Sequence, residues 1–161
     1  FCYNLFMINL NKKAPSFKLP DQKGKVHDLK DYLGKWVLLY FYPKDDTPGC
    51  TTEACQIHDQ FAQFKKLGIK VLGVSGDSPE SHAKFIKKFS LPFSLLADTN
   101  KLVVQAYGVW GEKSLLGKKY FGIRRTSFLI NPAGKIAKVY EAVKPADHAA
   151  EVLADVKMLT A

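Results

Sequence analysis

The sequence has few cysteines and no long apolar run, and both shortages exclude classes of protein. Its three cysteines, Cys2, Cys50 and Cys55, are an odd number and far too few for a disulfide-stapled secreted scaffold. No segment approaches the roughly 20 consecutive apolar residues that a membrane-spanning helix requires. A hydrophobic fraction of 47% and a charged fraction of 24% exclude a disordered or collagen-like chain. The 161 residues therefore predict one globular domain, residues 1–161, that folds without a disulfide or a metal.

Basic residues are in excess, which raises the question of an anionic partner. The 24 Lys and Arg residues against 15 Asp and Glu residues give a net charge of +9, so a nucleic acid is the first partner to consider. The basic residues do not form a tract but are scattered in pairs, at positions 12–13, 65–66, 87–88, 118–119 and 124–125. Because such pairs are typical of solvated helix ends and loops, we expect no nucleic-acid partner. A basic nucleic-acid-binding module is kept as the less favoured alternative.

The first ten residues are fairly apolar but do not resemble a secretory signal. Lys12 and Lys13 follow the apolar stretch instead of preceding it, which is the wrong order for a signal peptide. We expect Met7 to be the native start and residues 1–6 to be an upstream or non-native extension. A cytoplasmic location follows by default, and there thiols stay reduced unless they carry out redox work.

Strand-like and helix-like segments alternate in the first half of the chain. Residues 36–41 and 70–75 are apolar runs that predict strands covered on both faces. Between them, residues 50–67 predict one helix, and Gly68 ends it. The apolar face of this helix is expected to hold Ala54, Ile57, Phe61 and Phe64. These segments form a βαβ unit.

The second half continues the pattern and ends with two strands and a helix. Ser78 and Pro79 predict the start of a helix whose buried stripe is Ala83, Ile86 and Phe89. A strand over 93–97, a short helix over 103–107, a hairpin of 126–130 and 135–140, and a last helix over 147–159 follow. The order is that of an α/β protein with a thioredoxin-like fold, a central mixed β-sheet flanked by helices.

One segment has the pattern of a reactive cysteine. A buried strand ends near residue 41, a polar loop with two prolines follows, and a helix begins at Cys50. A cysteine in the first turn of a helix lies near unpaired backbone N–H groups and the positive end of the helix dipole, which favour the nucleophilic thiolate. Thr47 is placed to bring a hydroxyl beside the sulfur. From its position alone, Cys50 could equally be a buried structural cysteine.

Three separated motifs resemble one family. The pattern Pro43-x-x-x-Thr47-x-x-Cys50 is similar to the active-site signature of peroxiredoxins, and residues 41–55 resemble the Q-type branch, also called bacterioferritin comigratory proteins. Residues 109–113 and 125–130 resemble later segments of that family, in the same order and spacing. The resemblance runs from about residue 12 to the C-terminus and implies a thiol-dependent peroxidase of antioxidant defence.

The resemblance implies a role for each matching residue. Cys50 corresponds to the peroxidatic cysteine, which attacks a peroxide oxygen and becomes a sulfenic acid. Thr47 corresponds to the threonine that orients the peroxide, and Pro43 to the proline that shields the pocket. Cys55 corresponds to the resolving cysteine of many members, which would close an intrachain Cys50–Cys55 disulfide.

An arginine is also implied, and two adjacent residues compete for that position. Arg125 aligns with the family arginine that holds the thiolate, on the basis of its spacing to Phe128. Because successive strand residues face opposite ways, only one of Arg124 and Arg125 can point at Cys50. A guanidinium aimed at the departing peroxide oxygen stabilises negative charge where it develops, which is why the chemistry needs this residue type.

The five-residue separation of Cys50 and Cys55 conflicts with a disulfide in an intact helix. Residues five apart in an α-helix have Cα atoms about 8.6 Å apart, on sides of the helix that differ by roughly 140°. A disulfide requires Cα atoms within about 7 Å of each other. We therefore predict that the first turns of this helix unwind when Cys50 is oxidised.

Other interpretations of the cysteines are weaker. A general thiol–disulfide oxidoreductase on the same fold is the main alternative enzyme, but no Cys-x-x-Cys pair is present. Cys50, Cys55 and His58 lie around one stiff helix and cannot converge on a metal, so no metal and no cofactor are expected. The expected partners are a hydroperoxide substrate and a thioredoxin-like protein reductant. The protein is expected to be a monomer or a weak homodimer, without membrane association.

Overall fold

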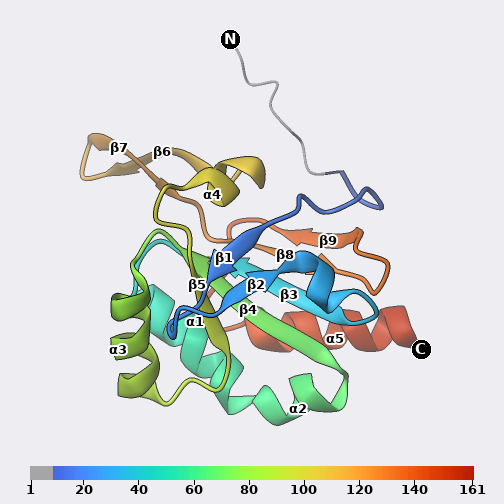
Figure 1. Cartoon of the computed structure of the whole chain (residues 1–161). Coiled ribbons are helices and arrows are strands. Elements are labelled where there is room, and N and C mark those ends of the chain that lie inside the picture. Colours follow the sequence, from blue (N-terminus) through green and yellow to red (C-terminus); the bar gives the residue numbers. More distant parts are fainter. Residues whose placement is uncertain (1–8) are drawn as a thin grey trace.

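A five-stranded mixed β-sheet forms the centre of the computed structural model, which describes residues 9–161 (Figure 1). The strand order is β5 (Ser94–Ala97), β4 (Ile69–Ser75), β3 (Trp36–Phe41), β8 (Thr126–Ile130) and β9 (Ile136–Tyr140). β3, β4 and β5 are parallel, and β8 and β9 are antiparallel to their neighbours. The predicted mixed sheet with flanking helices is therefore confirmed.

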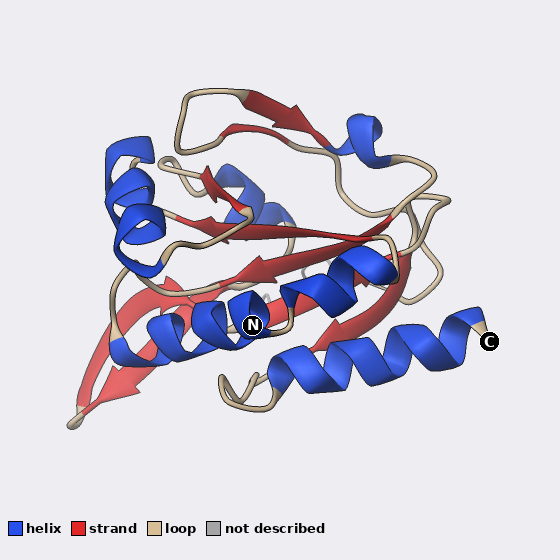
Figure 2. Ribbon diagram, turned by 90° about the horizontal axis from the view of Figure 1, so that it is seen from below, coloured by secondary structure: helices blue, strands red, loops and turns tan. Residues whose placement is uncertain are grey.

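Helices connect the parallel strands and cover one face of the sheet. α1 (Pro48–Asp59) and α2 (Phe61–Lys66) cross from β3 to β4, and α3 (Pro79–Phe89) crosses from β4 to β5. Seen from below, α1, α2 and the C-terminal α5 (His148–Thr160) lie on the same side of the sheet (Figure 2). The short helix α4 (Leu102–Ala106) follows β5 and packs its Val104 on the opposite side.

The alternation of side chains along β3 divides the core into two clusters. Leu38 and Tyr40 pack with Cys50, Ile57 and other residues of α1, α2 and α5. Leu39 and Phe41 pack on the other face, with α4 and the N-terminal part of the chain. This is the pattern expected of a strand that is buried on both faces, because neighbouring side chains point in opposite directions.

Two hairpins lie outside the central sheet, and the sequence patterns had not predicted either of them. β1 (Lys18–Pro20) pairs with β2 (Val26–Asp28), and a 3-10 helix, η1 (Leu29–Tyr32), follows. β6 (Trp110–Leu115) pairs with β7 (Lys118–Ile123), and this second hairpin projects from the body of the protein (Figure 1). It comes directly before β8.

Two details of the predicted helices are wrong. The single helix expected over 50–67 is two helices, because the chain leaves helical geometry at Gln60, where φ is −108° and ψ is 14°. On α3, Ile86 and Phe89 of the expected stripe pack against the core but stay partly exposed, and the fully buried residues are His82 and Phe85. A polar side chain on the buried face interrupts the apolar periodicity from which the stripe was predicted.

The other predicted elements agree with the structure to within one or two residues at their ends. Ser78 is the N-cap of α3 and accepts a hydrogen bond from the backbone N–H of Ser81. The hairpin of β8 and β9 is present. Cys2, Met7 and the extension expected over residues 1–6 lie outside the described residues. None of the helices within residues 9–161 has the length and apolar character needed to cross a membrane.

Candidate active site

Cys50 lies in the first turn of α1, the helix that follows the loop at the carboxyl end of β3. Thr47 is the N-cap residue, with extended backbone angles, and Pro48 occupies the first helical position, which its fixed φ favours. The Cys50 side chain is buried, with 1% of its surface exposed, and packs against the core under α1. The sulfur therefore lies near the positive end of the α1 dipole, in a position from which bulk water is largely excluded.

Arg125 is the residue that contacts the sulfur. It lies just before β8, and its Nη2 is 3.4 Å from Cys50 Sγ. Gly49 makes this approach feasible, because a Cβ at that position would lie 2.9 Å from the same Nη2 atom. Arg124 points elsewhere and lies over Gly111. Of the two adjacent arginines, Arg125 is therefore the one that contacts the sulfur.

Glu53 is a further member of the site that sequence reasoning missed. Its side chain is fully buried, and its Oε2 accepts a hydrogen bond of 2.6 Å from Arg125 Nη1. Its other oxygen, Oε1, has no hydrogen-bond partner among the described residues. Burial raises the pKa of the Glu53 carboxyl to about 7, although the Arg125 charge opposes this rise. The arginine therefore bridges a buried carboxyl and the cysteine sulfur.

The remaining predicted residues lie around this centre without contacting the sulfur. Thr47 Oγ1 donates a hydrogen bond of 2.8 Å to the carbonyl of Lys44. Pro43 is partly buried in the loop between β3 and α1. Cys55 is partly buried on α1, and both Cys50 and Cys55 are free thiols. Burial, with a contribution from Asp59, raises the pKa of the Cys55 thiol, so Cys55 is held as a thiol in this state.

A buried polar network fixes the loop that carries Thr47. Asp45 Oδ2 accepts hydrogen bonds from Ser81 Oγ at 2.8 Å and from His82 Nδ1 at 2.7 Å. Tyr42 donates to the other oxygen of Asp45 at 2.5 Å. The second ring nitrogen of His82 faces the Leu96 carbonyl at 3.0 Å, so both nitrogens of the ring point at acceptors. The network ties the active-site loop to α3 and β5, which limits its freedom to move.

The same network is the one candidate metal cluster within the described residues, and we interpret it as structural. Asp45, Asp77 and His82 offer three ligand atoms within 4.8 Å of one another. Each of these atoms already takes part in hydrogen bonds, including those from Ser75 Oγ to Asp77 and from the Asp45 N–H to Asp77. A buried polar group whose hydrogen bonds are made within the protein needs no ion to satisfy it.

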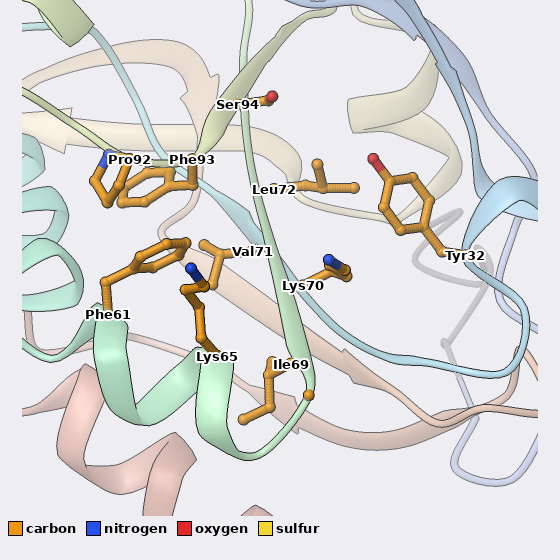
Figure 3. A pocket seen from close by; sticks show the side chains of 11 residues that line it. Tyr32, Phe61, Lys65, Ile69, Lys70, Val71, Leu72, Pro92, Phe93 and Ser94 are labelled. Atoms are coloured by element: carbon orange, nitrogen blue, oxygen red, sulfur yellow. The ribbon is translucent and has the colours of Figure 1, made fainter.

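A hollow of about 400 Å³ lies away from the cysteine, along the first half of β4. Figure 3 shows Phe61 and Phe93 on one side of it and Tyr32 on the other, with Lys65 and Lys70 between them. Cys50 follows the carboxyl end of the neighbouring parallel strand β3, so the hollow lies toward the opposite end of the sheet. It has no part in the site around the sulfur.

The arrangement at Cys50 is suited to nucleophilic attack on a substrate whose leaving group departs with negative charge. The Arg125 guanidinium contacts the sulfur, and Cys50 stands in the first turn of α1, at the positive end of the helix dipole. The same donors can stabilise charge that develops on a leaving oxygen beside the sulfur. No other side chain among the described residues donates a hydrogen bond to Cys50.

Comparison with known proteins gives a consistent picture. The AhpC/TSA family model matches residues 10–139. Peroxiredoxin Bcp of Bacillus subtilis is 46% identical over 150 residues, which are 93% of this chain and 96% of that protein. Peroxiredoxin Bcp of Escherichia coli is 50% identical over 135 residues, which are 84% of this chain and 86% of that protein.

Solved structures agree with the sequence matches. A PrxQ mutant of Xylella fastidiosa superposes with a TM-score of 0.90 at 34% identity, covering 96% of this chain and 98% of that one. The bacterioferritin comigratory protein of Xanthomonas campestris, studied for its alkyl peroxide reduction activity, superposes with a TM-score of 0.85 at 39% identity. That match covers 90% of this chain and 92% of the other.

Proposed function

The chain belongs to the AhpC/TSA family and, within it, to the Q-type or Bcp peroxiredoxins, and we propose that its Cys50 thiolate reduces hydroperoxides. The contact of 3.4 Å between Arg125 Nη2 and Cys50 Sγ carries the proposal. It supplies the positive charge that the nucleophile needs at the place where the peroxide must bind. A single domain, as expected from the length, suffices for this chemistry.

In the first step the Cys50 thiolate attacks one oxygen of the peroxide and the O–O bond breaks. The sulfur takes the attacked OH and becomes a sulfenic acid, and the other oxygen leaves as hydroxide or alkoxide and takes a proton from water. Arg125 lies where it can hold both the thiolate and the leaving oxygen. Thr47, whose proton is donated to the Lys44 carbonyl, presents an oxygen that can accept the O–H of the bound peroxide.

In the second step Cys55 resolves the sulfenic acid. The Cys55 sulfur bonds to the Cys50 sulfur, the S–O bond breaks, and the hydroxyl leaves as water with the proton of the Cys55 thiol. Both cysteines lie in α1, where intact helical geometry places their Cα atoms about 8.6 Å apart, beyond disulfide range. The beginning of α1 must therefore unwind.

Two features of α1 support such unwinding. The N-cap residue Thr47 makes no side-chain hydrogen bond to the first turn, so one common stabilising contribution, typically about 1 kcal/mol, is missing there. The break at Gln60 separates α1 from α2, so α1 can unwind without disturbing α2. Unwinding also exposes the disulfide, and a dithiol reductant can then attack it.

In the third step a thioredoxin-like dithiol protein reduces the disulfide and becomes a disulfide itself, which restores both thiols. We assign the protein to the cytoplasm, where such reductants keep thiols reduced. We expect it to act as a monomer or a weak homodimer, because every residue assigned to the reaction comes from one chain.

A peroxide-consumption assay with thioredoxin, thioredoxin reductase and NADPH tests the proposed function. Cys50→Ser is expected to abolish turnover. Cys55→Ser is expected to consume one equivalent of peroxide and then stop, because the sulfenic acid forms but is not recycled. Full turnover by Cys50→Ser, or a wild-type protein without peroxidase activity, would show the assignment to be wrong.

A further inference from the structure

The hairpin of β6 and β7 carries large apolar side chains that stay exposed within the described chain, although Phe121 stacks on Trp110. The two strands pair only with each other, and the hairpin projects from the sheet (Figure 1). Four large apolar side chains near its tip are exposed, by 44% to 95% of their surface: Leu115, Leu116, Tyr120 and Phe121. We call these four residues the hairpin tip. A cluster of this kind on a projecting element is typical of an interaction surface.

A leucine at position 116 does not stabilise the fold. It occupies the turn with φ of 51°, followed by Gly117 with φ of 79°. Positive φ at both turn residues favours Asn-Gly, and a leucine there is disfavoured by the clash of its Cβ with the backbone. The Leu116 side chain is 95% exposed, so no internal packing offsets this strain. The leucine is better explained by a contact with another molecule.

The charges beside the hairpin tip indicate the chemistry of that molecule. Lys113, Lys118 and Lys119 lie on the hairpin, and Glu112 is its single acidic residue, so the hairpin carries a net charge of +2. The whole chain has a net charge of +9. A complementary partner therefore presents an apolar surface bordered by acidic groups.

The base of the hairpin reaches the active site. Lys113 Nζ donates a hydrogen bond of 3.1 Å to the carbonyl of Ile123, two residues before Arg125. Burial and the Arg125 charge lower the pKa of Lys113, while the charge of Cys50 opposes this, so the lysine lies within electrostatic range of both. The hairpin therefore leads, through Ile123, directly into the segment that places Arg125 against Cys50.

We propose that the hairpin tip is the docking surface for the protein dithiol that reduces the Cys50–Cys55 disulfide, an acidic protein with an apolar rim around its own thiols. The inference rests on the proposed function, because only a recycled disulfide needs such a partner. Docking through the hairpin leaves α1 free to unwind while the reductant stays in place, since the hairpin and α1 are separate elements.

The test compares two variants of the hairpin with one matched control. Leu116→Asn removes the apolar side chain and places the favoured Asn-Gly pair in the turn, so the hairpin itself is retained or stabilised. Lys118→Glu reverses a charge for which no ion pair is observed among the described residues. Leu159→Asn makes the same chemical change as the first variant at an exposed leucine near the end of α5.

Two rates are measured for each protein: oxidation by one equivalent of hydrogen peroxide, and recycling by a bacterial thioredoxin with its reductase and NADPH. We expect Leu116→Asn to lower kcat/KM for thioredoxin about tenfold, the scale of losing an apolar anchor at an interface. Lys118→Glu should slow recycling and weaken its dependence on salt. Dithiothreitol, which needs no docking surface, should recycle all variants equally, and Leu159→Asn should behave as wild type.

Several results would overturn the inference. Recycling of Leu116→Asn by thioredoxin at the wild-type rate would leave the hairpin tip without a role in reduction. The inference would also fail if Leu116→Asn were recycled more slowly by thioredoxin and by dithiothreitol to the same extent, because that result would indicate a disturbed active site. Sedimentation showing that Leu116→Asn dissociates a dimer would assign the hairpin to a second copy, and binding of the wild type to anionic lipid vesicles would assign it to a membrane surface. A wild type that consumes peroxide but is not recycled by thioredoxin refutes the docking assignment, whereas one that consumes no peroxide refutes the proposed function itself.

Discussion

Replacement of Glu53 by glutamine should change how the stability of the protein depends on pH. The carboxyl is fully buried with one unpartnered oxygen, and its pKa rises from 4.5 to about 7 on burial, although Arg125 opposes the rise. Between pH 4.5 and about pH 7, the Glu53 carboxyl of the folded protein keeps a proton that the unfolded chain has lost. The free energy of unfolding therefore falls as the pH rises through this range, and the contribution is lost above about pH 7.

The magnitude follows from the two pKa values. The difference between 4.5 and about 7, at 1.36 kcal/mol for each pH step, amounts to about 3 kcal/mol over the full range. Between pH 5 and pH 8 about 2–3 kcal/mol of this is expressed, because the unfolded carboxyl has already begun to ionise at pH 5. Glu53→Gln does not titrate, so its stability relative to wild type should improve by that amount over the same interval.

Urea unfolding of the reduced proteins at pH 5 and pH 8 measures this difference. Glu141→Gln, which changes an exposed carboxyl, is the control and should track the wild type. Other titrating groups also change the free energy of unfolding with pH, but they do so equally in the variant and the wild type. Their contribution therefore cancels when the two proteins are compared at each pH. A difference between Glu53→Gln and wild type that stays constant from pH 5 to pH 8 would refute the reasoning, since Glu53 would then be ionised throughout as an ordinary partner of Arg125.

Three further outcomes are expected. Arg125→Lys should slow the reaction of Cys50 with peroxide about 10²–10³-fold in stopped-flow measurements, because one donor is lost from the reacting centre; an unchanged rate would argue against the assigned role. Gly49→Ala should slow the same reaction with little loss of stability, since the new Cβ would lie 2.9 Å from Arg125 Nη2 and displace the guanidinium. Burial, aided by the Arg125 charge, lowers the pKa of His148 to about 4, so the free energy of unfolding should fall as the pH drops from 6.5 toward 4. Urea unfolding of His148→Gln should lack this loss, and an equal loss in the variant would show that another group causes it.

The sequence predicted the sheet and the cysteine position well because both depend on local patterns. The apolar runs of β3 and β4 and the helix start at Cys50 are visible in short stretches of sequence. Strand alternation indicated only that one of Arg124 and Arg125 could face Cys50, and the choice of Arg125 came from the family resemblance, through its spacing to Phe128.

Residues that depend on distant partners were missed. Glu53 looks like a surface residue of a helix, and its burial depends on Arg125, 72 positions away. His82 and Asp45 are 37 positions apart, and neither is apolar, so no periodicity indicates that they are buried together. The Thr-Pro-Gly-Cys motif could have drawn attention to Gly49, but the contact that requires a glycine comes from Arg125, 76 positions further along the chain.

The break between α1 and α2 had a similar origin. The apolar residues Ile57, Phe61 and Phe64 keep a helical spacing through Gln60, so the pattern predicts one continuous helix. The exposed hairpin of β6 and β7 was missed because most of its apolar side chains lie outside the core and do not alternate with polar ones over its length.

Intact-mass analysis of the reduced protein after one equivalent of hydrogen peroxide tests the central claim most directly, when combined with tryptic mapping. The account predicts a loss of two hydrogens, located in the single tryptic peptide of residues 45–65 that contains both Cys50 and Cys55. A stable gain of one oxygen on Cys50, or a disulfide between two chains, would contradict the resolving role of Cys55 and the unwinding of α1 that it requires.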